Sequence, residues 1–208
     1  MEAVEQRGPG RPVDPARRRQ RRREILDAAA RVFSERGYAS TDVAQIAAMA
    51  GLTKASVYHY FESKEALFFA TVDAKLGMIA QQMASLADSV GDRLEGIGAA
   101  VEAYLRFFSE NPDAVELMIE ERSSFKTREK HTYVLYREAT LPKWTAALEA
   151  QIASGTLRKV PPVATLRLLS DLLFGRVINN FFVGDPRPIR EQSEEILDVL
   201  LLGLLPRA

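Results

Sequence analysis

Apolar side chains recur at the spacing of an α-helix along most of the chain, and this periodicity restricts the fold more than any other feature. In residues 24–37, Ile25, Val32 and Phe33 share one helical face, and Gly37 is predicted to end the helix. Further helices are predicted over about 64–88, 93–110, 112–123, 130–154, 163–183 and 189–204. No strand-like alternation of useful length occurs. The sequence therefore predicts an all-α fold of about nine helices.

The segment STDVAQIAAMAGLTKASVYHYF, residues 40–61, predicts two short helices joined by a turn. Ser40 or Thr41 is expected to cap the first of them, and Gly51 is expected to end it. The second is predicted over residues 54–60, with Val57 and Phe61 facing inward. Two short helices joined by a turn with Gly, after a longer helix, indicate a helix-turn-helix.

The outer face of the second short helix carries side chains suited to DNA. Lys54 can meet a phosphate or a guanine edge, and small residues such as Ala55 and Ser56 permit close approach. Tyr58 and His59 point outward, so we expect both to contact DNA. For Tyr60 two interpretations stay open, DNA contact or packing at the helix junction.

Residues 24–70 resemble the DNA-binding domain of the TetR/AcrR family of bacterial transcriptional regulators. The resemblance rests on the ordered features of ILDAAARVFSERGYASTDVAQIAAMAGLTKASVYHYFESKEALFFA. It implies a three-helix DNA-binding domain over residues 24–68 and a helical effector-binding and dimerisation domain over residues 69–208. Before them, residues 1–23 are predicted to form a basic disordered arm.

The resemblance also implies roles for single residues. Thr41 is expected to contact phosphate, and Lys64, at the start of the fourth helix, to clamp a phosphate. Lys54, Tyr58 and His59 match recognition-helix positions. Ala55 stands where relatives often have Gly, and His59 where they often have Tyr, which could alter base preference. The expected DNA contacts are Arg11, Thr41, Thr53, Lys54, Ala55, Ser56, Tyr58, His59 and Lys64.

The N-terminal arm adds a second possible DNA contact. Pro9-Gly10-Arg11-Pro12 resembles an AT-hook core, in which an extended Arg enters a narrow minor groove. Residues 17–23, RRRQRRR, could contact phosphates. The alternative is a solvated tail that aids solubility.

The last two helices are apolar on more than one face, which a lone surface helix does not need. In a chain of 208 residues a second copy is the simple way to cover the extra face, so we expect a homodimer with two helices from each subunit. Such a dimer would present two recognition helices to a palindromic operator. The predicted interface residues are Leu169, Leu173, Val177, Phe181, Ile196, Leu200 and Leu204.

Aromatic residues are frequent in the middle helices, where relatives enclose an effector pocket. The expected lining is Tyr104, Phe108, Met118, Arg122, Phe125, Tyr136, Trp144, Phe174 and Asn180. The alternative is that the aromatic residues are ordinary core and that Arg122 belongs to a solvated loop. A mostly apolar pocket suits a flat or hydrophobic ligand such as a phenolic or flavonoid compound.

Charge and composition narrow the class of protein. Residues 1–64 contain twelve Lys and Arg and eight Asp and Glu, a net +4, whereas residues 65–208 contain sixteen and twenty, a net −4. A basic end suits DNA. The sequence has no Cys, two His and no phosphate-loop or metal-ligand spacing, so we expect neither an enzyme nor a cofactor or metal. No apolar run is long enough to span a membrane, and a cytoplasmic location is expected.

These observations favour a ligand-responsive repressor released from its operator by a small hydrophobic or aromatic effector. Activation instead of repression stays open. The alternative function is a ligand-independent architectural or cell-division factor on the same fold, which would have no enclosed cavity and many dispersed chromosomal sites.

Overall fold

The computed structural model describes residues 14–89 and 94–204, which form nine α-helices and no strand. The helices are α1 (Pro15–Ser40), α2 (Val43–Met49), α3 (Lys54–Tyr60), α4 (Lys64–Ser89), α5 (Leu94–Glu110), α6 (Pro112–Ser124), α7 (Thr132–Ala153), α8 (Pro162–Phe182) and α9 (Ile189–Leu204). The all-α prediction is confirmed.

The first helix begins much earlier than predicted. Asp14 is its N-cap, its carboxylate accepts from the backbone N–H of Ala16 at 2.9 Å, and Pro15 occupies the first turn. The basic run 17–23 is therefore part of a continuous helix, and the predicted disordered arm over residues 1–23 is wrong from Pro15 onward. Arg11 and its flanking Pro-Gly and Pro lie outside the described residues.

Gly37 interrupts α1, as the sequence predicted. Its backbone has φ 74° and ψ 165°, a conformation that residues with a side chain avoid. The break removes the helical acceptor from the N–H of Tyr38, which donates instead to the Glu120 carboxylate of α6 at 2.9 Å. The kink in α1 is thus tied to a helix 82 residues further along the chain.

The caps of the short helices differ in part from the prediction. Asp42, rather than Ser40 or Thr41, caps α2, and Gln45 completes a capping box by accepting from the N–H of Asp42 at 3.2 Å. Thr41 instead lies just after α1. Gly51 has φ 65° in the turn before α3, which matches the predicted break.

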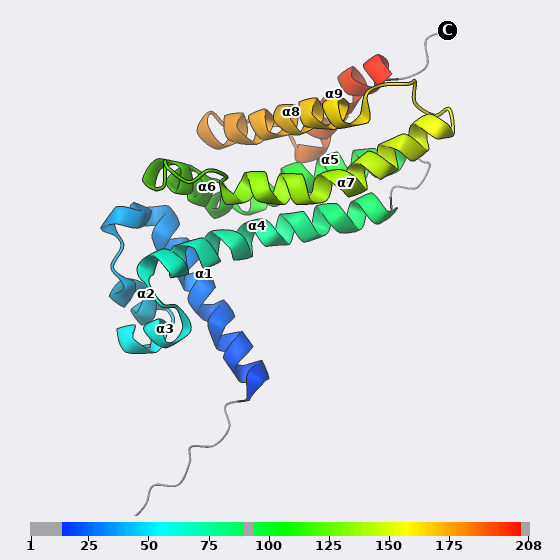
Figure 1. The fold of residues 1–208 in the computed structure, drawn as a ribbon. Coiled ribbons are helices and arrows are strands. Elements are labelled where there is room, and N and C mark those ends of the chain that lie inside the picture. Colours follow the sequence, from blue (N-terminus) through cyan, green and yellow to red (C-terminus); the bar gives the residue numbers. More distant parts are fainter. Residues whose placement is uncertain (1–13, 90–93, 205–208) are drawn as a thin grey trace, which may run out of the picture.

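The first three helices pack on the beginning of α4. Ile25, Phe33, Ile46 and Val57 are fully buried there, and Phe68 of α4 contacts Phe33 edge-on with ring centres 5.1 Å apart. Figure 1 shows α4 continuing from this unit along α7 through the rest of the molecule. The proposed division between residues 68 and 69 therefore falls inside one unbroken helix.

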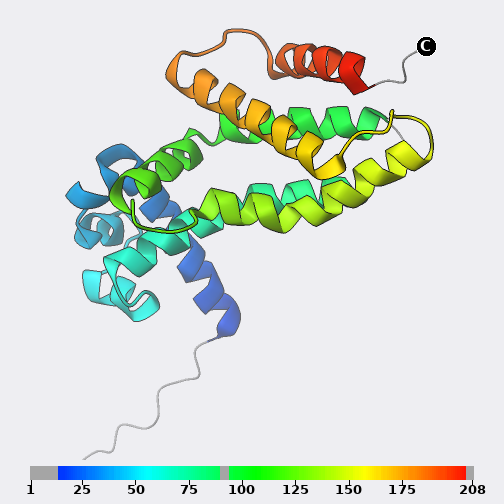
Figure 2. The ribbon, with the colours of Figure 1, turned by 45° about the horizontal axis from the view of Figure 1, so that its top comes forward.

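The remaining helices form a bundle around α4, α5 and α7. Helices α8 and α9 lie on the side of the molecule away from α2 and α3, in both views of the ribbon (Figures 1 and 2). Glu121 of α6 is buried and stabilises the loop between α6 and α7. Its carboxylate accepts from the N–H of Thr132 at 3.1 Å and pairs with Arg128. In the part of the chain that is described, no helix has the length and apolar content needed to cross a membrane.

Candidate nucleic-acid interface and ligand cavity

Helix α3 presents a polar outer face above an apolar inner one. Val57 is fully buried and the C-cap residue Phe61 is 5% exposed, so both anchor the helix to the core as predicted. Lys54, Tyr58 and His59 are exposed on the outside. An exposed helix with side chains that donate and accept hydrogen bonds can enter a major groove.

Tyr60 follows the packing interpretation in this structure. It is half-buried and packs against the hydrophobic core, while the His59 ring meets it edge-on with ring centres 5.8 Å apart. Tyr58, in contrast, is 41% exposed although it is a large aromatic residue. The difference arises because residues two positions apart on a helix point about 200° apart, to nearly opposite sides.

Lys54 is held by an ion pair with Asp42. Its Nζ lies 2.9 Å from Oδ1 of Asp42, which links the start of α3 to the start of α2. The hydrogen bond from the N–H of Ala44, followed by that from Lys54, lowers the pKa of Asp42, and the bond to Asp42 raises the pKa of Lys54. Both side chains are exposed, so the pair contributes little stability and leaves Lys54 free to exchange its partner for a phosphate.

The hydroxyl groups of Thr53 and Thr41 make hydrogen bonds with backbone groups of the protein. Thr53 is the N-cap of α3, and its hydroxyl accepts from the N–H of Ser56 at 3.2 Å and lies 2.9 Å from the Ser56 hydroxyl. Thr41 is buried, and its hydroxyl donates to the carbonyl of Gly37 at 2.7 Å. The structure thus gives both threonines a structural task that the sequence interpretation did not assign.

Lys64 stands at the first turn of α4, next to the α1 kink. Its Nζ donates to the carbonyl of Ala39 at 3.2 Å and lies 4.7 Å from the centre of the Tyr38 ring. Ser63 caps the helix by accepting from the N–H of Ala66 at 3.0 Å. A lysine at a helix N-terminus adds its charge to the free backbone N–H groups, and this combination attracts anions.

The basic run extends α1 as an exposed cationic helix. Residues 17–20, 22 and 23 are exposed, and Arg21 pairs with Glu24 at 2.7 Å. The guanidinium of Arg22 lies 5.1 Å from the centre of the Phe61 ring, which places this helix beside the end of α3. The extension and α3 therefore belong to one basic region of the surface.

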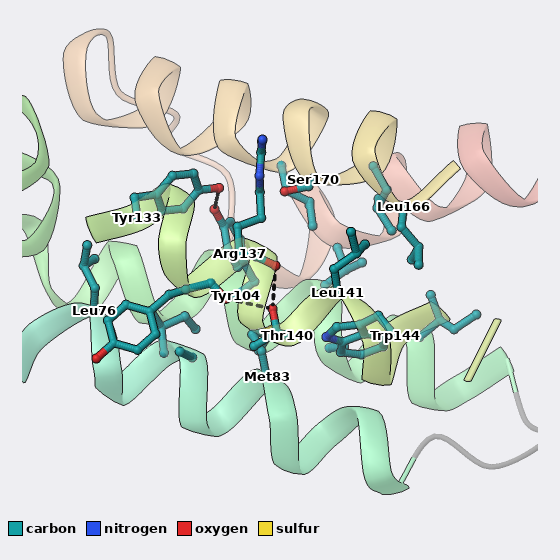
Figure 3. A pocket seen from close by; sticks show the side chains of 18 residues that line it. Leu76, Met83, Tyr104, Tyr133, Arg137, Thr140, Leu141, Trp144, Leu166 and Ser170 are labelled. Carbon is teal, nitrogen blue, oxygen red and sulfur yellow. Dashed lines mark hydrogen bonds between the residues drawn. The ribbon is translucent and has the colours of Figure 1, made fainter. Parts of the chain in front are cut away.

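A second site lies within the bundle, as a cavity of about 140 Å³ between α4, α5, α7 and α8. Its walls are mainly apolar (Figure 3). The lining residues are Leu76, Ile79, Ala80, Met83, Ile97, Ala100, Val101, Tyr104, Tyr133, Tyr136, Arg137, Thr140, Leu141, Trp144, Leu166, Leu169, Ser170 and Leu173. This volume is close to that of an engineered protein cavity that binds benzene, so it suits an apolar group of about one six-membered ring.

Three of the predicted lining residues, Tyr104, Tyr136 and Trp144, line this cavity. The other six do not: Met118, Arg122 and Phe174 border an open depression between α6 and α8, Phe108 is buried in the core, Phe125 packs on Tyr38, Phe68 and Phe69, and Asn180 donates to Gln192. The sequence interpretation missed Arg137, which lies one turn after Tyr133 on the same helix. The YVLYR spacing within α7 was the signal available for it.

The cavity tyrosines stay protonated at neutral pH. Burial raises the pKa of Tyr104 well above its ordinary value and also raises that of Tyr133. Burial and a 2.7 Å hydrogen bond to Asp73 raise the pKa of Tyr136 to about 12. The phenol groups of Tyr104 and Tyr133 lie 2.9 Å apart and share a hydrogen bond.

The apolar face available to a second copy lies one helical position away from the predicted one. Leu173, Val177 and Ile196 are buried within the chain, Leu169 and Phe181 pack against its main core and Leu200 against a smaller one, so these predicted interface residues mainly serve the subunit itself. The side chain of Leu204 lies outside the described ones. Among the side chains that the structure describes, the exposed large apolar residues of α8 and α9 are Val163, Leu168, Leu172, Phe182 and Val199. Helical periodicity showed that two faces are apolar but not which of them faces outward.

Comparisons with known proteins agree with this architecture. Residues 25–71 match the family model described as bacterial regulatory proteins, tetR family. The transcriptional repressor KstR2 of Rhodococcus jostii is 29% identical over 186 residues, which cover 88% of this chain and 91% of that protein.

Two solved structures show the same fold. A TetR-family regulator from Mesorhizobium loti has a TM-score of 0.76 and 19% identity, covering 91% of this chain and 99% of that one. The fatty acid degradation regulator FadR of Bacillus halodurans has a TM-score of 0.73 and 18% identity, covering 92% and 97%. The match over the helix-turn-helix, the relative along most of the length and the shared helical fold lead to one conclusion: residues 25–71 form a DNA-binding domain of the tetR family, in a chain that is similar to transcriptional regulators over most of its length.

Proposed function

We propose that the protein is a homodimeric repressor that binds a palindromic operator and leaves it when a small apolar effector enters the cavity. The observation that carries this proposal is that α4 extends from the DNA-facing unit to the wall of the cavity. Lys64 begins the helix beside the DNA-facing unit, and Leu76, Ile79 and Met83 of the same helix line the cavity. A ligand that displaces the cavity wall therefore acts on the element that supports the DNA-binding unit.

A second link joins α6 to the kink in α1. Glu120 accepts from the N–H of Tyr38, and Lys64 lies over the Tyr38 ring. A shift of α6 moves Glu120 and a shift of α4 moves Lys64, and both of these residues contact Tyr38 at the kink in α1. Because packed helices shift between discrete arrangements, a small movement at the cavity can change the orientation of α3.

The proposed dimer uses the exposed apolar row of α8 and α9. Leu168 is 72% exposed and Val199 is 68% exposed, and both border an open groove between the two helices. A second copy of this face would cover both rows around a two-fold axis. The dimer would then present two α3 helices about 34–36 Å apart, or somewhat farther, to two half-sites.

Repression is favoured because the Rhodococcus jostii relative is a repressor that aligns with most of this chain. The effector would lower operator affinity only as far as it prefers the geometry that does not fit DNA. A ligand-sized cavity between α4, α5, α7 and α8 favours this mechanism over a ligand-independent architectural role. The DNA contacts that we propose are Lys54, Ala55, Tyr58, His59, Lys64 and the arginines of residues 17–23, acting on chromosomal DNA in the cytoplasm.

Selection from a random duplex library by the purified protein tests this function. We expect enrichment of an inverted repeat whose two halves are about one helical turn or slightly more apart. Enrichment of a single half-site would contradict the dimer, and the absence of any motif would favour the architectural role.

A further inference from the structure

Several polar groups gather at one end of the otherwise mainly apolar cavity. Tyr104 of α5 and Tyr133 of α7 bring their hydroxyls together there, and Arg137 follows one turn after Tyr133. In Figure 3 the Arg137 side chain passes beside the Tyr133 hydroxyl toward α8 and Ser170. Polar groups that converge in an otherwise apolar pocket set the orientation and chemistry of its ligand.

The hydroxyls of Tyr104 and Tyr133 can donate hydrogen bonds, but they carry no charge at neutral pH. Two phenols that share one hydrogen bond use one of their two protons, and the remaining O–H, which also has the Ser170 hydroxyl within hydrogen-bond reach, can turn to another acceptor. Their raised pKa values keep both protons in place at neutral pH. The pair is therefore suited to an acceptor oxygen.

Arg137 adds a positive charge at the same place. Its Nη1 donates to Asp171 at 2.8 Å, and the Asp171 side chain is 65% exposed, on the solvent side of α8. Arg137 lines the same cavity as both tyrosines and lies one helical turn after Tyr133. None of the described residues that line the cavity is acidic. A guanidinium has five N–H donors, so donors remain for a ligand beside the bond to Asp171.

We propose that the effector is a compact carboxylate with an apolar body of about one ring, and that Arg137 and the Tyr104–Tyr133 pair hold its carboxylate. This inference rests on the proposed function only in naming the ligand an effector. The carboxylate accepts charge-assisted bonds from the guanidinium and a bond from the phenol O–H that the tyrosine pair does not use internally. The apolar body fills the space between Leu76, Met83 and Trp144.

The single Trp of the chain provides a readout that is independent of DNA, because Trp144 lines the cavity. Benzoate and its neutral isostere benzamide are titrated against the full-length protein while Trp fluorescence is followed. We expect benzoate to bind at least about tenfold more tightly than benzamide, because the amide forgoes the charge-assisted bonds. Arg137→Gln should remove this preference, and Tyr133→Phe should reduce it.

The matched control is Arg167→Gln, which alters an exposed arginine of α8 outside the cavity and should keep the preference. Equal binding of benzoate and benzamide, an unchanged preference in Arg137→Gln, or no binding of either compound would overturn the carboxylate assignment. Release from DNA is measured separately. Benzoate that binds with the expected preference but leaves the operator affinity unchanged would support the carboxylate site and refute the proposed effector mechanism.

Discussion

Tyr58 and His59 owe their exposure to Val57 and Phe61, which occupy the inward face of α3. Side chains that are held outward by their buried neighbours can meet base edges without rearranging the core. This division within seven residues is the reason that single substitutions on α3 should separate base recognition from folding.

Tyr58→Ala and His59→Ala should each weaken operator binding by about 1–3 kcal/mol, the usual range for a base contact. Binding to random duplex should change much less. Fluorescence anisotropy with both duplexes at equal salt measures the difference. Tyr60→Phe is the control, because the half-buried ring keeps its packing. Equal losses on both duplexes would show that Tyr58 and His59 do not read bases.

Asp185, in the turn between α8 and α9, should make the free energy of unfolding of the protein depend on pH in acid. Hydrogen bonds from the Arg187 side chain and backbone lower the pKa of Asp185 from 3.8 to about 2. The folded state holds the proton less tightly, so the carboxylate stabilises the protein above about pH 4 and loses this effect as the pH falls toward 2. Wild type and Asp185→Asn should therefore differ most in urea unfolding at neutral pH and converge in acid. A difference that does not change with pH would contradict this role, and Asp198→Asn controls for the loss of an exposed charge on α9.

At the scale of helices, the sequence correctly predicted those helix boundaries that are set by residues next to them in the chain. Asn111-Pro112, Pro161-Pro162 and Gly51 mark boundaries through backbone restrictions that act on neighbouring residues, and the structure has helix ends at these positions. The start of α1 was missed because a run of arginines was interpreted as disorder, whereas Asp14 and Pro15 are a cap and a first-turn residue.

The cavity could be predicted only in part for a related reason. Tyr104 lies on α5 whereas Tyr136 and Trp144 lie on α7, and which of their faces meet depends on how the helices rotate and cross. Helical periodicity identifies apolar faces but gives no rotation of one helix against another. The same limit explains why Leu173 and Val177 were assigned to the dimer face although they are buried within the chain.

The helical extension of α1 should contribute salt-dependent, sequence-independent affinity. Replacing Arg17, Arg18 and Arg19 with Gln should weaken binding to operator and random duplex alike. The slope of log K against log salt should fall by about 0.9 for each phosphate that the protein no longer neutralises. A control variant with Arg106, Arg167 and Arg190 replaced by Gln, all exposed and outside α1, has the same net charge and should keep the slope. An equal reduction of the slope in both variants would indicate a general charge effect rather than direct phosphate binding.

At the scale of the whole molecule, the proposed operator binding depends on a second copy that packs against α8 and α9. Leu172→Glu places a charge in the middle of the exposed apolar row, where Leu172 is 46% exposed. The variant should be largely monomeric in light scattering at concentrations where wild type is a dimer, because an uncompensated charge cannot be buried there. Leu135→Glu on α7 is the matched control, since Leu135 is 43% exposed and lies on another helix. A Leu172→Glu variant that stays dimeric would refute this interface.

The central claim is that this molecule recognises a discrete operator and is not a general DNA-binding protein. A footprint of the purified protein on the DNA that flanks its own gene, at near-physiological salt, tests this claim most directly. We expect one protected region with two symmetric halves, each contacted by one α3. Diffuse protection that disappears as salt is raised, without a discrete boundary, would contradict it.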